Sequence, residues 1–278
     1  MEISVAHSPD SDDAFMFYAL ATGRIDTGDL RFRLLLKDID SLNRAAESAT
    51  YDVTAISFAA YPRLAASYQL LSCGASLGNG YGPIIVARRQ MSRQELAHAT
   101  IAIPGRTTSA YLALKLYLDA EPQVEEVRFD RIMQEVASGS FDAGVIIHEG
   151  QMTYRELSLV RIADLGQWWS QETALPLPLG ANAIRRSLPE EVKARTARYL
   201  RESIALALHN QAAALDYALQ FARDLTRERA DEFVKMYVND YTLDLGADGI
   251  RAVESFLRAA LSEETANQLF PLEYVMPA

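Results

Sequence analysis

The chain has 278 residues, of which 49% are hydrophobic and 23% are charged, a composition typical of a globular protein. This length exceeds what one hydrophobic core usually holds, so two domains are expected. The formal net charge of -10 and the pI near 5.0 argue against a nucleic acid or an anionic membrane as the main partner. An anionic small molecule still fits, provided that its site supplies local positive potential.

The N-terminal residues and the single cysteine narrow the class of protein further. The stretch MEISVAHSPDSDDAF has no basic region followed by an apolar one, so no secretory signal is expected. No apolar run reaches the length that a membrane-spanning helix needs. Cys73 is the only cysteine, which excludes internal disulfides and thiolate metal clusters. These features predict a cytoplasmic protein without membrane association; a homodimer is compatible with them.

Strand-like and helix-like segments alternate in the first ninety residues. Short apolar runs predict strands, and amphipathic runs that start at a capping residue predict helices. The expected strands are 2–7, 31–38, 52–57, 68–73 and 83–89, and the expected helices are 12–23, 40–47 with Asp40 as its cap, and 58–66 with Ser57 as its cap. This order is typical of a mostly parallel sheet covered by helices.

The alternation restarts near residue 90 and gives way to a helical region after Pro189. Strands are expected at 100–105, 124–129, 144–150 and 159–164, and helices at 107–119 and 130–139. The segment GQWWSQETALPLPLG marks a return crossing. We therefore predict a larger α/β lobe from residues 1–88 and 178–278, and a smaller one from 89–177. This is the two-lobed, periplasmic-binding-protein-like (type II) α/β fold, with mostly parallel sheets, flanking helices and a helical C-terminal region; its lobes close on a ligand.

The stretch GVIIHEG at 144–150 reads as a buried strand that ends in two titratable residues. Ligands of open α/β sheets bind beyond the carboxyl ends of the strands. His148 is therefore a candidate general base, because imidazole moves protons near neutral pH. The alternative is a histidine that only bonds a neighbouring loop. Side-chain alternation along a strand favours Glu149 as a solvated carboxylate.

A second candidate is IPGRTTSAY, where a strand passes into a helix through Arg106, Thr107 and Thr108. A helix N-terminus presents unpaired N–H groups and positive potential, which suits a carboxylate or a phosphate. The simpler reading is an N-cap by Thr107 or Thr108. The same argument applies to Ser57, so hydroxyl-capped helices of the two lobes are expected to hold an anion between them.

The first strand-to-helix turn, HSPDSDDAF, places Asp10, Asp12 and Asp13 together. Helix capping is the simplest role, and contact with a cation or with substrate hydroxyls is the alternative. No His, Asp and Glu cluster with ligand spacing accompanies them, so no metal is expected. Neither GxGxxG, GxxxxGK[ST] nor GxSxG occurs at a suitable position, so no nucleotide cofactor and no hydrolase elbow are expected.

Several motifs in one order resemble the 1,4-dihydroxy-6-naphthoate synthases of the futalosine route to menaquinone. These motifs are SPDSDDAFMFYAL, AISFAAY, GYGPIIVAR, IPGRTTSAY, RFDRI, AGVIIHEGQMTY, DLGQWW, LPLPLGA and YVNDYTLDLG. The resemblance runs from residue 8 to about residue 245. The family reads SPCPNDTF where this chain has SPDSDDAF, so Asp13 is retained, a hydroxyl is lost at Ala14 and two acids appear.

The resemblance implies a lyase that converts cyclic dehypoxanthine futalosine to 1,4-dihydroxy-6-naphthoate without a cofactor. His148 matches the proposed catalytic histidine of the family, and Ser57, Thr107 and Thr108 match positions that line its cleft. Arg106 and Asp13 are expected at the substrate as well. Two alternatives remain open: chorismate dehydratase, which shares the scaffold but lacks the IIHE strand end, and a cytoplasmic solute-binding protein without turnover.

Overall fold

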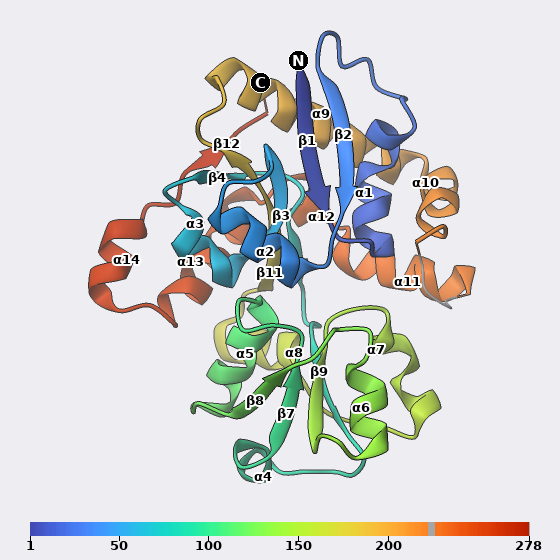
Figure 1. Cartoon of the computed structure of the whole chain (residues 1–278), viewed down its shortest axis with the longest axis vertical. Coiled ribbons are helices and arrows are strands. Elements are labelled where there is room, and N and C mark those ends of the chain that lie inside the picture. The colour runs from blue at the N-terminus through green and yellow to red at the C-terminus, as the bar shows by residue number, and fades with distance from the viewer. Residues whose placement is uncertain (222–225, 278) are drawn as a thin grey trace.

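The computed structural model describes residues 1–221 and 226–277, which form two lobes that each surround a β-sheet (Figure 1). The first sheet has the strand order β12-β4-β11-β3-β1-β2, with β5 paired to β11. Its strands are β1 (Glu2–His7), β2 (Arg31–Leu36), β3 (Val53–Ser57), β4 (Tyr68–Leu71), β5 (Ser76–Gly78), β11 (Leu177–Arg185) and β12 (Tyr274–Val275). The N-terminus lies at the end of this lobe that is far from the second lobe (Figure 1).

The second sheet has the strand order β10-β6-β9-β7-β8. Its strands are β6 (Ile84–Ala87), β7 (Thr100–Ile103), β8 (Gln123–Glu126), β9 (Ala143–Ile146) and β10 (Val160–Asp164). The predicted boundary at residue 88 placed β6 in the first lobe, whereas its pairing with β9 and β10 places it in the second sheet. The chain thus enters the second lobe between β5 and β6 and returns to the first at β11.

The prediction of mostly parallel sheets is wrong, because both sheets are mixed. Strands β1, β2 and β3 are parallel, as are β7, β8 and β9. However, β11 runs antiparallel to β3, β4 and β5, and β6 runs antiparallel to β9 and β10. The two antiparallel strands are those by which the chain enters and leaves the second lobe. Each of these two strands begins where the chain arrives from the other lobe. It therefore runs in the direction opposite to that of its neighbours.

Helices cover both sheets and make up most of the chain after residue 189. Those before the return crossing are α1 (Ser11–Ala21), α2 (Ile39–Glu47), the 3-10 helix η1 (Phe58–Ala60), α3 (Tyr61–Leu64), α4 (Arg93–Ala97), α5 (Ser109–Leu118), α6 (Ile132–Ser138), α7 (Gly150–Thr153), η2 (Tyr154–Leu157) and α8 (Leu165–Thr173). Those after it are α9 (Glu190–His209), α10 (Gln211–Ala218), α11 (Arg227–Tyr237), α12 (Asp240–Leu243), α13 (Gly246–Arg258) and α14 (Glu263–Leu269).

Helix α1 is apolar nearly all round, and its place in the fold explains why. Phe15, Met16, Phe17 and Tyr18 are all buried, in one core cluster with residues of α9, α10 and α11. A helix that is hydrophobic on every face lies inside the protein rather than on its surface. Burial on all sides fixes the helix axis and thereby holds its N-terminal turn beside the second lobe.

Two of the three predicted helix caps differ from the structure, and the third, which left Thr107 and Thr108 open, is confirmed for Thr108. Asp38, not Asp40, caps α2 and accepts a hydrogen bond from the Ser41 N–H at 2.9 Å. Thr108, not Thr107, caps α5. Ser57 precedes η1 but makes no side-chain capping bond. The segments before α2 and α5 each offer two or more capping residues within three positions, and tertiary contacts decide which of them caps. Ser57 has the extended backbone of a cap, but its hydroxyl accepts a hydrogen bond from the Asn43 side chain instead.

Candidate active site

Residues of both lobes line a cavity of about 120 Å³. Three predicted site residues line it: Asp13, Ser57 and Thr108. The other polar lining residues are Ser8, Asp10, Asp12, Ser76, Ser109, Asn182 and Tyr237. Among the described residues that line the cavity there is no Lys and no Arg. Any anion bound there must therefore be held by neutral donors.

The N-terminus of α5 supplies such donors. The Thr108 hydroxyl accepts a hydrogen bond from the Tyr111 N–H at 3.2 Å and donates one to the Gly105 carbonyl at 2.8 Å. The next two N–H groups, those of Ser109 and Ala110, have no hydrogen-bond partner in the described part of the chain, and both residues line the cavity. Unpaired N–H groups at a helix start form an anion-binding position, which agrees with the predicted role of this turn.

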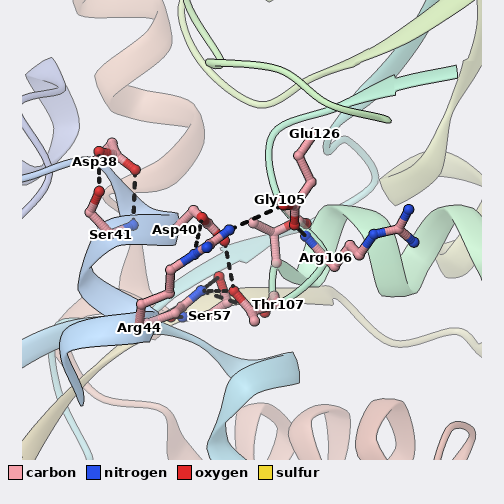
Figure 2. A network of polar contacts seen from close by, with 11 residues as sticks. Asp38, Asp40, Ser41, Arg44, Ser57, Gly105, Arg106, Thr107 and Glu126 are labelled. Atoms are coloured by element: carbon pink, nitrogen blue, oxygen red, sulfur yellow. Dashed lines mark hydrogen bonds and ion pairs between the residues drawn. The ribbon is translucent and has the colours of Figure 1, made fainter. Parts of the chain in front are cut away.

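Ser57 and Thr107 are joined by a side chain that the sequence did not single out. The Asn43 side chain donates to Ser57 Oγ and to Thr107 Oγ1, both at 3.1 Å, and its carbonyl accepts the Ser57 N–H at 2.8 Å. Thr107 Oγ1 donates to Asp40 Oδ1 at 3.0 Å (Figure 2). The Thr107 hydroxyl thus joins the two lobes, and Thr107 is absent from the residues that line the cavity.

Arg106 also lies outside the cavity. Its side chain extends away from Asp40 and Thr107 (Figure 2), and its guanidinium donates to the Val124 carbonyl at 2.9 Å. Its N–H donates to Glu126 Oε1 at 2.7 Å. The positive potential at this end of the cavity therefore comes from the helix N-terminus and not from the arginine charge.

Another wall of the cavity is acidic and is formed by the turn that leads into α1. The Ser8 N–H donates to Asp13 Oδ2 at 2.8 Å, and the Ser8 hydroxyl donates to Asp10 Oδ2 at 2.9 Å. Burial raises the pKa of Asp13 to about 7, although the hydrogen bond from Ser8 opposes the shift. Burial, followed by the charge of Asp13 and of the other nearby carboxylates, raises the pKa of Asp12 well above its usual range. This wall therefore retains protons at neutral pH.

His148 is buried beside the cavity but is absent from the residues that line it; its neighbour Ile147 does line it. The Gly150 N–H donates to His148 Nδ1 at 2.9 Å, so Nδ1 is the acceptor in this arrangement. Nε2 then carries the proton and donates to the Phe129 carbonyl at 2.9 Å. The imidazole is thus in its neutral Nε2–H tautomer and is held by backbone groups of its own lobe.

The expectation that Glu149 is a solvated carboxylate is wrong. Glu149 is only 3% exposed, and its Oε1 accepts the Ser11 hydroxyl at 2.8 Å. Alternation along a strand was the wrong guide because β9 ends at Ile146 and the chain then turns into α7. The contact joins the second lobe to the first turn of α1.

Sequence reasoning missed several lining residues, among them Asn182 and Tyr237. Asn182 is 1% exposed; its Nδ2 donates to the Gly74 carbonyl at 2.9 Å, and its Oδ1 has no partner among the described residues. Tyr237 is buried and shares a hydrogen bond with Gln151. Two sequence features could have identified these residues. Asn182 is the one amide in an otherwise apolar strand, LPLGANAI, and Tyr237 lies within the motif YVNDYTLDLG.

The described residues contain no group of three or more His, Cys, Asp or Glu side chains arranged to hold a metal ion. Among the same residues no helix combines the length and apolarity needed to cross a bilayer.

Solved structures similar to this one include a protein of Archaeoglobus fulgidus, with a TM-score of 0.89 and 48% identity over 93% of this chain and 96% of that one. A Candida albicans protein described as having the generic periplasmic binding protein fold gives a TM-score of 0.74 at 13% identity, over 96% and 94% of the two chains. The alkanesulfonate-binding protein of Xanthomonas axonopodis gives 0.69 at 12%, over 99% and 96%. The last two show the fold alone, and they confirm the periplasmic-binding-protein-like architecture.

Sequence comparison identifies the family. A family model described as menaquinone biosynthesis matches residues 3–262. A relative from Thermus thermophilus, named 1,4-dihydroxy-6-naphthoate synthase, is 41% identical over 251 residues, which is 90% of this chain and 91% of the relative. One of the same name from Streptomyces coelicolor is 35% identical over 280 residues, or 99% and 98% of the two chains. The chain therefore belongs to the menaquinone-biosynthesis family, together with these two 1,4-dihydroxy-6-naphthoate synthases, as its motifs predicted.

Proposed function

We propose that this protein is a cytoplasmic carbon-carbon lyase that converts cyclic dehypoxanthine futalosine to 1,4-dihydroxy-6-naphthoate without a cofactor. One observation carries the proposal. The cavity has neutral anion-binding N–H groups on one wall and carboxylates on the other, in a chain similar along most of its length to two proteins named for that product. A substrate with a carboxylate at one end and sugar hydroxyls at the other matches these two walls.

The carboxylate of the aromatic ring is assigned to the start of α5. The N–H groups of Ser109 and Ala110 donate to it, and the hydroxyls of Ser57 and Thr108 lie on the same lining. Held there, the substrate places its sugar-derived ring toward the turn that carries Asp12 and Asp13. Carboxyl groups at that wall exchange hydrogen bonds with the ring hydroxyls, and their protonated forms also donate.

His148 is the proposed general base. It takes the proton whose removal starts the fragmentation of the sugar-derived ring; the electron pair released then breaks a carbon-carbon bond, and formation of the aromatic ring drives the step. The Nδ1 lone pair faces the Gly150 N–H in the present arrangement, so the base becomes available when the backbone of residues 148–150 shifts. Asp13, which lines the cavity directly, is the next candidate.

The test is incubation of the protein with cyclic dehypoxanthine futalosine, with the naphthoate detected by liquid chromatography and mass spectrometry. We expect product from the unaltered chain, and turnover lower by at least about 100-fold in His148→Asn, since a positioned general base contributes roughly 10²–10⁴-fold. Tight binding without product at any neutral pH would instead support the solute-binding alternative. Dehydration of chorismate in a parallel incubation would support the chorismate dehydratase alternative.

A further inference from the structure

Residues 147–151 connect β9 to α7 and lie against the first lobe. Ile147 lines the cavity, and His148, Glu149, Gly150 and Gln151 are all buried. Helix α7 has only four residues, too short to be stable on its own. The conformation of this segment, which includes the N–H that bonds His148 Nδ1, must therefore be set by what packs on it.

One of these contacts comes from Tyr237, the last residue of α11. Its hydroxyl lies 2.9 Å from Gln151 Nε2 and 3.1 Å from Gln151 Oε1, so it can accept from the one and donate to the other. The ring of Tyr237 packs on Phe233 with centroids 5.0 Å apart and edge-on to Tyr81 at 5.9 Å. Burial raises the pKa of Tyr237, so the phenol stays protonated and able to donate.

The second contact is between Ser11 and Glu149. The Ser11 hydroxyl donates to Glu149 Oε1 at 2.8 Å, and Ser11 is fully buried as the first residue of α1. Both contacts have one partner in each lobe, and their second-lobe partners, Glu149 and Gln151, follow His148 on the chain and flank Gly150. Separation of the lobes breaks both contacts at once, whereas the two backbone bonds to His148 lie within the second lobe.

We infer that the Tyr237–Gln151 pair is a positioning device for His148, supported by Ser11 and Glu149, so that closure of the lobes sets the orientation of the imidazole. This inference rests on the proposed function of His148. Tyr237 and Gln151 are positioning residues here, because they act on the segment that holds the histidine. Gln151 is absent from the residues that line the cavity, which separates its effect from direct contact with substrate.

The test is a double-mutant cycle with Tyr237→Phe and Gln151→Met. Each change should lower kcat by about tenfold, the scale that one buried hydrogen bond carries, and leave KM nearly unchanged. Because both changes break the same contact, the double variant should be no slower than the slower single variant. The matched control is Tyr68→Phe, which removes a partly buried hydrogen bond to the Tyr51 carbonyl, at 2.7 Å, inside the first lobe. It should leave kcat within about twofold, because that bond does not touch the histidine segment.

A second readout does not depend on turnover. In protein labelled with 15N-histidine, the ring nitrogen signals of His148 should change in Gln151→Met and stay unchanged in Tyr68→Phe. Additive losses in the cycle, an effect on KM alone, or unchanged ring signals would overturn the positioning role. If the unaltered chain made no naphthoate while the ring signals still responded to Gln151→Met, the proposed reaction would fail and the positioning of His148 would stand.

Discussion

The turn from β1 into α1 and the turn from β7 into α5 have the same local design and opposite chemistry. Each leads from a parallel strand into a helix whose N-terminus faces the cavity. The first carries Asp10, Asp12 and Asp13, whereas the second carries Thr108 and Ser109. The first turn places carboxyl groups of its own at the helix N-terminus, whereas the second leaves its N–H groups for a ligand.

The comparison also shows that the helix dipole does not decide the protonation state of the carboxyl groups in the first turn. Carboxylates at a helix start normally titrate low, because the dipole favours their charged form. Here the pKa of Asp13 and that of Asp12 are raised, chiefly by burial. Loss of water around several neighbouring carboxyl groups therefore outweighs the local dipole. The cavity thus has one wall that keeps protons and one that attracts anions.

Of the two turns, the acidic one should show the larger effect when it is substituted. Asp13→Asn removes a group that titrates near neutral pH and lines the cavity, so kcat/KM for the futalosine substrate should fall by about 10–100-fold. The control is Asp26→Asn, at an exposed carboxylate of the same lobe. Steady-state kinetics across pH 5.5–8.5 measures both, and equal rates for the two variants would remove Asp13 from the site.

The α5 turn should show a smaller effect, confined to binding. Thr108→Val removes the capping hydroxyl and so disturbs the turn whose Ser109 and Ala110 N–H groups are proposed to hold the anion; it should weaken binding of the naphthoate product by about tenfold, the scale of one lost helix cap. Thr108→Ser keeps the hydroxyl and should bind normally. Titration calorimetry gives the Kd, and the circular dichroism spectrum checks the helix. Equal Kd values in the two variants would place the anion elsewhere, with Ser57 as the next residue to change.

The acidic wall should also affect stability in a pH-dependent way. Because the folded-state pKa of Asp13, about 7, exceeds its ordinary value of 3.8, folding favours the protonated form. Its contribution to stability is complete below about pH 4 and is lost as pH rises through about 7. Asp13→Asn should reduce this loss, raising the Tm at pH 8 by about 2–4 °C for each kcal/mol recovered. Thermal unfolding at pH 5 and pH 8 tests this, and an unchanged difference in Tm between the two pH values would contradict it.

The smallest effect is expected from Arg106, the only cation in the α5 turn. Its guanidinium is tied to the Val124 carbonyl, away from the cavity. Arg106→Gln should therefore change the Kd of the naphthoate by less than about twofold, since a solvent-exposed charge outside the site contributes little. A tenfold weaker Kd would show that the arginine reaches the ligand and that the anion wall depends on a charge.

Sequence patterns predicted most strands and helices close to their observed bounds, because apolar periodicity reflects burial directly. The helix after IPGRTT begins within two residues of its predicted start, whereas the strand predicted at 144–150 is buried but ends at Ile146. Strand direction was not predictable, because β6 and β11 carry the same apolar pattern whether they pair parallel or antiparallel. Residue composition identified both turns as candidate sites. It did not show which hydroxyl or carboxylate of each turn faces the cavity.

By itself the sequence determined the family, the alternation of elements and the two polar turns, since these follow from local composition and motif order. Only the tertiary structure decided that Thr108 lines the cavity while Thr107 and Asn43 join the lobes, and that Glu149 is buried against Ser11. Those outcomes depend on contacts between residues far apart in the chain, 138 positions in the case of Ser11 and Glu149. Burial and proton affinity are set by such contacts, and no local pattern encodes which distant group will arrive.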